Sequence, residues 1–223
     1  MKLNISDYKA YIVDCDGTLY FQHGVRMSMM LCMLKYFLTH FWRLKDLFII
    51  FCYRRIRERR QYAAAANIEA MEYAAAALKC RTTPDYVATV IKRWMIERPC
   101  QYLKAAQDEA LLSFLREQQR QGKPVIVYSD YPLSDKLAAL DFAPSASYYT
   151  GDAVINCLKP DNQGLEYILS TLRQKNIHRN EVLFIGDRDD RDGLCARESG
   201  VDCLILKKFK GEREGQWRKL MQN

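Results

Sequence analysis

The sequence predicts an α/β protein: a Rossmann-like parallel sheet core with an inserted all-helical domain. Two observations lead to this fold class. From residue 100 onward, short runs rich in aromatic and β-branched residues alternate with helical segments, which is typical of parallel strands joined by helical crossovers. Before residue 100 a single strand-like run lies near the N-terminus, and a long helical stretch follows it. Because a lone strand needs partners, we expect it to be a central strand of the C-terminal sheet.

The N-terminal part is expected to hold one strand and then only helices. The strand, Tyr8 to Val13, is a short apolar run that stops at Asp14. Residues 27–52 place apolar side chains three and four positions apart, which predicts helices with a buried face, and charges interrupt them too often for a bilayer span. Residues 54–79 contain alanine runs and no glycine or proline, so helix is expected there as well. A further helix should begin at Thr83 and Pro84 and end near residues 98–99.

The C-terminal part is expected to alternate between helices and strands. We expect helices at residues 105–121, 133–140, 164–175 and 190–199, and strands at residues 124–128, 147–150, 181–185 and 202–206. Two domains follow: residues 1–20 and 100–223 form the sheet core, and residues 21–99 form the helical insertion.

Composition places the chain among globular proteins and locates its charge. Of the 223 residues 49% are apolar and 27% are charged, and the net charge is +7. Residues 21–99 carry 14 basic and 6 acidic side chains, so the basic excess lies in the helical insertion. Eight scattered cysteines without a Cys-x-x-Cys pair indicate reduced thiols rather than disulfides or a zinc site. Residues 1–20 do not resemble a secretory signal, so we expect a cytoplasmic protein.

Polar side chains cluster at the expected carboxyl ends of the strands, where ligands bind in parallel α/β sheets. Six of them form the candidate site: Asp14, Asp16, Ser129, Lys159, Asp187 and Asp192. Carboxylates this dense repel one another in a partly dry crevice, and a divalent cation relieves the repulsion. Oxygen ligands favour Mg²⁺. Paired carboxylates, a hydroxyl and a lysine together predict phosphoryl transfer, most simply the hydrolysis of a phosphate ester.

The same residues resemble the haloacid dehalogenase (HAD) superfamily. Its four motifs are matched in order by Asp14-Cys15-Asp16-Gly17-Thr18-Leu19, by Ser129, by Lys159-Pro160, and by Gly186-Asp187 with Asp192. The helical insertion between the first two motifs resembles the C1-type cap of that superfamily, which lies over the active site. Its dehalogenases lack a carboxylate at the position of Asp16. The resemblance therefore implies a Mg²⁺-dependent phosphatase that acts on a small phosphomonoester.

The resemblance also implies roles for three residues of the first and second motifs. Asp14 is expected to be the nucleophile that forms an aspartyl-phosphate, and Asp16 to protonate the leaving group and then activate water. Ser129 is expected to hydrogen-bond the transferring phosphoryl group. Asp130 follows it directly, and unless its carboxylate points away it would weaken phosphate binding.

For the remaining motifs the resemblance implies charge neutralisation and metal binding. Lys159 is expected to neutralise Asp14 and the phosphate. Mg²⁺ would be held by the Asp14 carboxylate, the main-chain carbonyl of Asp16 and Asp187, with Asp192 assisting directly or through water. Asp189 and Asp190 lie in the same loop and are alternatives to Asp192.

Two other functions are open. A phosphotransferase of the sugar-phosphate mutase kind resembles the same motifs. Alternatively, the chain is a membrane-surface or partner-binding module, because residues 43–60 hold seven basic and two acidic side chains directly after an aromatic segment. That stretch is a solvated helix face, an attractor of anionic substrate, or a contact with an anionic membrane in which Phe41, Trp42 and Phe48 are the interfacial anchors. No nucleic-acid-binding motif accompanies the charge, so nucleic acid is not expected.

Overall fold

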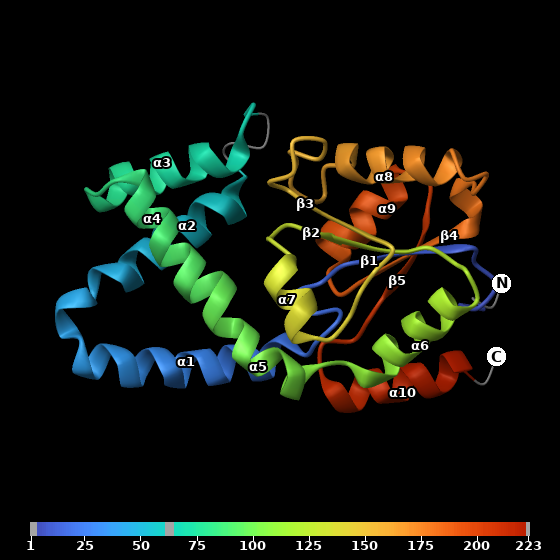
Figure 1. Ribbon diagram of the computed structural model, residues 1–223, viewed down its shortest axis with the longest axis horizontal. Helices are drawn as coiled ribbons and strands as arrows, with labels where there is room; N and C mark the ends of the chain where they lie inside the picture. Colours follow the sequence, from blue (N-terminus) through green and yellow to red (C-terminus); the bar gives the residue numbers. More distant parts are fainter. Residues whose placement is uncertain (1–3, 61–64, 222–223) are drawn as a thin grey trace.

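The computed structural model describes residues 4–60 and 65–221, and its centre is a five-stranded parallel sheet (Figure 1). The strand order is β3-β2-β1-β4-β5. The strands are β1 (Ala10–Val13), β2 (Val125–Ser129), β3 (Ala146–Tyr149), β4 (Val182–Gly186) and β5 (Asp202–Ile205). The N-terminal strand β1 therefore lies in the middle, with Ile12 level with Ile126 on one side and Phe184 on the other. This confirms the predicted α/β fold and the central place of the first strand.

Helices cover both faces of the sheet (Figure 1). On one side lie α6 (Glu109–Arg120) and α10 (Lys210–Met221), and on the other α8 (Gln163–Arg173) and α9 (Leu194–Glu198). Side chains of a strand alternate between the two faces of the sheet. Tyr11 and Val13 of β1 therefore pack in the hydrophobic core on one face, and Ala10 and Ile12 pack in the core on the other. Short helical segments complete this half: α7 (Ser134–Ala139), η3 (Arg179–Glu181) and the π-helical turn η4 (Asp189–Gly193).

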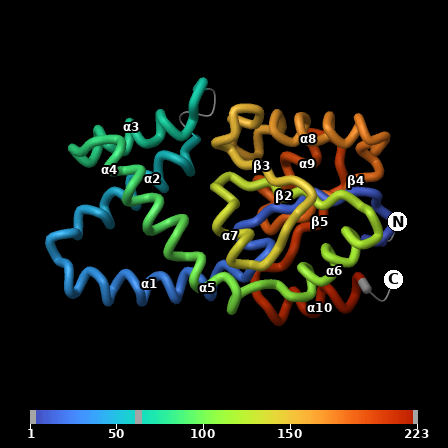
Figure 2. Tube along the Cα trace, in the orientation of Figure 1, coloured from blue at the N-terminus to red at the C-terminus, as the bar shows by residue number. Residues whose placement is uncertain are grey.

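The helical insertion lies beside the sheet rather than on either face (Figures 1 and 2). It consists of α1 (Gln22–Thr39), the 3₁₀ turn η1 (Phe41–Arg43), α2 (Lys45–Arg59), α3 (Ile68–Cys80), α4 (Pro84–Ile91), the π-helical turn η2 (Lys92–Glu97) and α5 (Arg98–Ala106). The chain enters and leaves it through one antiparallel bridge between Tyr20 and Gln107. Within the described residues, no helix combines the length and the hydrophobicity that crossing a bilayer requires.

Three expected helix boundaries are wrong. The helix expected over residues 54–79 is interrupted: α2 ends at Arg59, because Arg60 adopts a left-handed backbone conformation. Helix α3 begins after Asn67, whose side chain caps it. Residues 61–64 of the expected helix lie outside the described residues. The next helix does not end near residue 99 but continues to Ala106. The π-helical turn before Pro99 alters the hydrogen-bonding pattern at the point where proline offers no N–H. Helix α6 begins only after Asp108, whose carboxylate caps the amide of Leu111.

Candidate active site

The loop after β1 requires glycine at position 17, because any other residue there would be strained. Gly17 has a φ of +100°, and a Cβ placed there would lie 2.5 Å from a carboxylate oxygen of Asp187. Arg213 of α10 fastens the same loop, since its guanidinium donates hydrogen bonds to the carbonyls of Gly17 at 2.7 Å and Thr18 at 3.0 Å. Strands β1 and β4 pair side by side, and this loop after β1 packs against Asp187, which follows β4.

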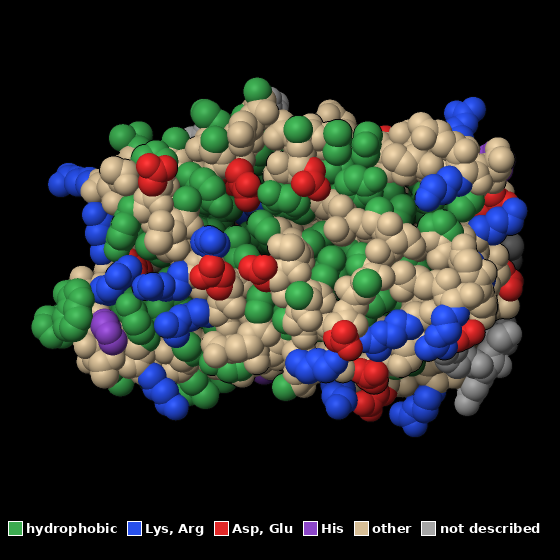
Figure 3. Space-filling model, in the orientation of Figure 1, with side chains coloured by type: hydrophobic (Ala, Val, Ile, Leu, Met, Phe, Trp, Pro, Cys, Tyr) green, Lys and Arg blue, Asp and Glu red, His purple; other side chains and the backbone are tan. Residues whose placement is uncertain are grey.

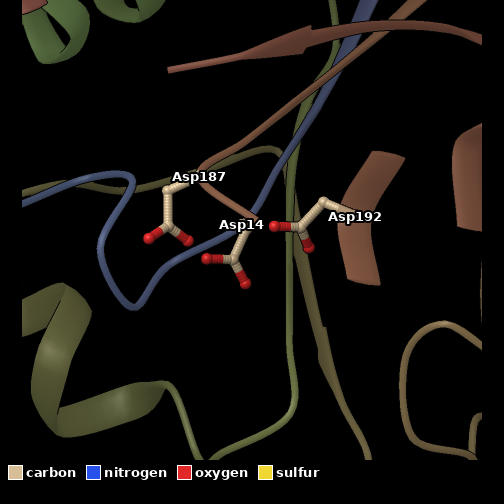
Figure 4. Close-up of side chains that lie close together, drawn as sticks. All are labelled: Asp14, Asp187 and Asp192. Carbon is tan, nitrogen blue, oxygen red and sulfur yellow. The ribbon is translucent and has the colours of Figure 1, made fainter. Parts of the chain in front are cut away.

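Three buried aspartates meet at this edge of the sheet (Figure 4). Asp14 follows β1, Asp187 follows β4 and Asp192 lies on η4, and one carboxylate oxygen from each lies within 4.8 Å of the others. Gly186 permits this approach, because a Cβ there would lie 2.4 Å from the Cβ of Asp192.

The two alternatives to Asp192 lie elsewhere in the loop. Asp189 pairs with Arg197 at 2.7 Å and Asp190 with Arg188 at 2.6 Å, and both aspartates are exposed. The structure therefore brings Asp192, and neither of its neighbours, to Asp14 and Asp187.

Lys159 is the cation at the centre of the cluster. Its side chain is 2% exposed, and its Nζ lies 2.5 Å from Asp14 Oδ1 and 2.7 Å from Asp192 Oδ1. It also donates to the carbonyl of Tyr128 at 3.3 Å. Burial alone would lower the pKa of this ammonium, but the Asp14 and Asp192 carboxylates outweigh burial and raise the pKa well above its ordinary value. Lys159 is therefore charged at neutral pH.

One lysine does not balance three carboxylates. Burial raises the pKa of Asp14 well above its usual range, and the Asp192 and Asp187 carboxylates add to this while Lys159 opposes it. Burial also raises the pKa of Asp187, with Asp192 as the next cause. If all three are ionised, two negative charges remain uncompensated. Oxygen ligands and a charge deficit of this size fit a divalent cation such as Mg²⁺.

Asp16 lies in a separate ion pair beside the cluster. Both of its carboxylate oxygens accept hydrogen bonds from Nζ of Lys136 at 2.6 Å, and the hydroxyl of Tyr20 donates to the same carboxylate. Burial would raise the pKa of Asp16, but the Lys136 ammonium offsets burial, and the net effect is a lowered pKa. Asp16 is therefore held as a carboxylate. Lys136 lies on α7 and is not among the site residues predicted from the sequence.

The second motif is buried next to the cluster. The Ser129 hydroxyl accepts a hydrogen bond from the amide of Tyr131 at 3.1 Å, and Ser129 does not line the cavity described below. Asp130 is held in place from two sides, since its carboxylate accepts from the amide of Lys159 at 3.1 Å and pairs with Arg191 at 2.9 Å. The charge of Asp130 is thus compensated within the protein.

A partly open cavity of about 540 Å³ lies between the helical insertion and these groups. Asp14, Asp16, Lys159, Asp187 and Asp192 all line it, together with side chains of α1, α2 and η2. On α2, Glu58 pairs with Arg191 at 2.7 Å, which joins the insertion to the sheet domain beside the cluster.

A second link from the insertion is fully buried. Arg57 pairs with Glu72, donates to the carbonyl of Asp130 and lies over the ring of Tyr131 at 4.5 Å. Arg57 belongs to the basic stretch 43–60, and its burial rules out a solvated helix face for this one side chain.

The sequence profile of the haloacid dehalogenase-like hydrolases matches residues 8–200, which is most of the chain. The chain belongs to the haloacid dehalogenase-like hydrolases. This HAD membership confirms the resemblance seen in the motifs. No curated protein sequence matches this HAD chain.

Solved structures share the HAD fold at low sequence identity. A HAD-hydrolase of Bacillus subtilis bound to magnesium superposes with a TM-score of 0.63 at 12% identity, covering 96% of this chain and 99% of that one. A 2-haloacid dehalogenase from Pseudomonas syringae gives 0.60 at 14% identity, covering 89% and 86%. A protein described as a phosphoglycolate phosphatase from Lactobacillus delbrueckii gives 0.54 at 16% identity, covering 95% and 92%. These similarities establish the fold.

Proposed function

We propose that this HAD hydrolase is a Mg²⁺-dependent phosphatase that hydrolyses a phosphomonoester through an aspartyl-phosphate on Asp14. Residues 1–20 and 100–223 would form the catalytic core and residues 21–99 the cap, with the last helix of the cap, α5, continuing to Ala106 where it joins the core. The observation that carries the proposal is the position of Asp14: it faces the cavity, touches Lys159 and lies among Asp187 and Asp192. The second carboxylate, Asp16, favours a phosphate ester over a halide as the substrate.

The metal would be held by the carboxylates of Asp14, Asp187 and Asp192, with the main-chain carbonyl of Asp16 as a further ligand. When bound, Mg²⁺ neutralises charge on the phosphoryl oxygens and on the carboxylates. The buried Asp14 and Asp187 then become more acidic, because a nearby positive charge favours the ionised form. The charge deficit of the site supports this part of the proposal.

In the first step a carboxylate oxygen of Asp14 attacks phosphorus. The bond from Asp14 to phosphorus forms, the ester P–O bond breaks, and the leaving oxygen takes a proton from Asp16. Lys159 holds Asp14 in place and compensates the charge of the transferring group. Thr18 supports the other Asp14 oxygen, since its hydroxyl donates at 3.2 Å. Ser129 would contribute its predicted hydrogen bond to the phosphoryl group by turning its hydroxyl toward the cavity.

In the second step Asp16 acts as the base. Its carboxylate takes a proton from the water that attacks phosphorus, the bond to Asp14 breaks, and inorganic phosphate leaves. Asp16 is then protonated. The Lys136 ammonium, which offsets burial, lowers the pKa of Asp16, so the free enzyme releases this proton to solvent and holds Asp16 as a carboxylate. The proton for the next leaving group is taken up again with the substrate, from solvent or from a singly ionised phosphomonoester.

The test is inorganic phosphate release from a panel of phosphomonoesters, with and without Mg²⁺. We expect metal-dependent release by the native enzyme and its loss in Asp14→Asn. Asp189→Asn is the matched control, because it removes an exposed aspartate that pairs with Arg197 outside the cluster, and it should keep its activity. Three results would contradict the proposal: halide release from haloacids without phosphate release, conversion of hexose phosphates without net phosphate release, or unchanged turnover in Asp14→Asn. The second would indicate a mutase.

A separate observation favours contact with an anionic membrane. The apolar side chains spaced three and four positions apart over residues 27–52 were expected on a buried helix face, and this is wrong. They form an apolar face along α1, η1 and α2 whose side chains are 44% to 73% exposed: Met27, Leu31, Leu34, Leu38, Phe41, Trp42, Leu44, Phe48 and Phe51. Hydrophobic side chains gather at the left edge of Figure 3, the end of the insertion where α1 turns into α2 in Figure 1. On α1 the exposed positions 27, 31, 34 and 38 follow helical spacing and form one stripe. An apolar stripe of this kind marks an interaction surface.

The positive charge around this apolar face favours an anionic lipid membrane as its binding partner. Between residues 27 and 55 the basic side chains are Lys35, Arg43, Lys45, Arg54 and Arg55, and the single acidic one, Asp46, is buried against Arg43. A second copy of the chain would bring like charges together, whereas anionic lipid is attracted. Phe41 and Trp42 supply the aromatic anchors typical of membrane interfaces.

Vesicle co-sedimentation tests this contact. We expect binding to vesicles that contain phosphatidylserine, weaker binding at high salt, and loss of binding when Phe41 and Trp42 are both replaced by serine. Leu78→Ser is the control, because Leu78 is exposed on α3 and lies outside the apolar face. Absence of binding to anionic vesicles, or a stable dimer in sedimentation equilibrium that the double variant abolishes, would overturn the membrane contact.

A further inference from the structure

The cavity under the insertion has two chemically different parts. Toward the sheet it is lined by the carboxylates and lysines of the candidate active site. Toward α1, α2 and η2 it is lined by apolar side chains, among them Met29, Met30, Met33, Ile50, Trp94 and Met95. Polar side chains of the insertion, including Arg54 and Glu58, also line it, and the Glu58–Arg191 ion pair places Glu58 against the sheet domain.

The apolar part is larger and more adaptable than a phosphate group needs. Four methionines contribute to it, and methionine side chains are flexible and polarisable, so they suit ligands with flexible chains. Trp94 is buried and stacks on Phe37, which gives one wall a rigid backing. A substrate that consisted of a phosphate and a short polar group would leave this apolar surface in contact with water, at a loss of binding free energy.

The apolar part also continues to the outside of the molecule. Met30 and Leu47 line the cavity, yet they are 55% and 37% exposed. They lie on α1 and α2 beside Leu31 and Phe48 of the exposed apolar face. A chain longer than the cavity would therefore reach the exposed apolar face past Met30 and Leu47.

We propose that the substrate is an amphiphilic phosphomonoester, with its phosphate at Asp14 and an extended apolar chain in the methionine-lined part of the cavity. The proposal rests on the phosphatase function proposed above and names its substrate class. With Mg²⁺ bound, the polar part would hold the phosphate headgroup, and the apolar part matches a hydrocarbon chain in chemistry. Burial of each methylene group should improve binding by about fourfold, which follows from the free energy of transferring a methylene group out of water.

A homologous series tests the substrate class. We would measure kcat/KM for n-alkyl phosphates of increasing chain length, below their micelle concentrations and in the presence of Mg²⁺. We expect kcat/KM to rise by up to about fourfold per methylene group and to level off once the apolar part is filled. Met33→Asn should flatten this rise, and Met71→Asn on α3, outside the cavity, should leave it unchanged.

A binding measurement keeps the test independent of turnover. Isothermal titration of the Mg²⁺-loaded native enzyme with the corresponding alkyl phosphonates should show affinity that increases with chain length and a heat capacity change that becomes more negative. Equal kcat/KM and equal affinity for short and long chains would overturn the amphiphilic substrate while leaving the phosphatase intact. Failure to hydrolyse any member, short or long, together with no release from the ester panel, would instead count against the phosphatase.

Discussion

Replacing Lys159 by methionine is the perturbation that most sharply probes the charge balance of the site. The Lys159 ammonium is buried and makes ion pairs with Asp14 and Asp192 at 2.5 and 2.7 Å. Methionine has a similar length and no charge, so the substitution removes the cation without opening a large cavity. In the metal-free protein Asp14, Asp187 and Asp192 would then face one another without compensation.

The magnitude follows from the burial of the pair. Removing one partner of a buried ion pair costs about 3–5 kcal/mol, because the other charge is left in a poorly solvated site. We expect Lys159→Met to lose about this much free energy of unfolding at pH 7.5 without metal, and less at pH 5, where protonation of the remaining carboxylates relieves the repulsion. Mg²⁺ should restore part of it, since a ligand at 100 times its dissociation constant stabilises the native state by about 2.7 kcal/mol.

Urea unfolding followed by tryptophan fluorescence, with EDTA and then with Mg²⁺, measures these differences. Lys104→Met is the matched control: its ammonium is exposed and lies 4.0 Å from Asp141, so its removal should change stability by at most about 1 kcal/mol. Equal stability of the native protein and Lys159→Met in EDTA would refute the reasoning. So would a variant that Mg²⁺ does not stabilise.

Three further predictions concern the same groups. Burial raises the pKa values of Asp14 and Asp187 above those of the unfolded chain, so their contribution to stability is full below about pH 4 and is lost as the pH rises through the raised values. Thermal unfolding should therefore show that Mg²⁺ stabilises the protein more at pH 7.5 than at pH 4.5; equal shifts would contradict a site built from these carboxylates. In Lys136→Met the pKa of Asp16 should rise, which moves the acidic limb of the pH–rate profile to higher pH, and an unmoved limb would show that Asp16 does not titrate in catalysis. Gly17→Ala should cost more than the roughly 1 kcal/mol expected from positive φ alone and should weaken Mg²⁺ binding. Gly122→Ala, which has positive φ and open space around it, isolates the backbone part in the same urea titration, and equal losses would mean that the contact with Asp187 is unimportant.

Much of the fold was predictable because it depends on local pattern. The apolar run before Asp14 and the alternation after residue 100 determine a parallel sheet, and all five strands lie where the pattern places them to within a few residues. The helix ends were less predictable. The stop at Arg59 and the passage through Pro99 depend on tertiary packing and on a π-helical turn, which residue propensities do not encode.

The candidate site also contains residues that the sequence predicts and residues that it does not. Asp14, Lys159, Asp187 and Asp192 occupy the ends of strands and adjoining loops, so topology brings them together. Lys136 reaches Asp16 from a short helix 120 positions away in sequence, and its position in the chain carries no signal of that contact. Burial of Arg57 against Glu72 depends on how α2 and α3 pack, and a charge count along the sequence treats it as one more surface arginine.

The covalent step at Asp14 can be tested directly by mass spectrometry of acid-quenched enzyme. In Asp16→Asn the base for the second step is lost, while an activated ester such as p-nitrophenyl phosphate needs no proton for its departure. We predict that this variant, mixed with the ester and Mg²⁺, accumulates one phosphoryl group on the peptide that contains Asp14, and that the combined Asp14→Asn and Asp16→Asn variant accumulates none. Phosphorylation of a different residue, or rapid phosphate release by the combined variant, would contradict nucleophilic catalysis by Asp14.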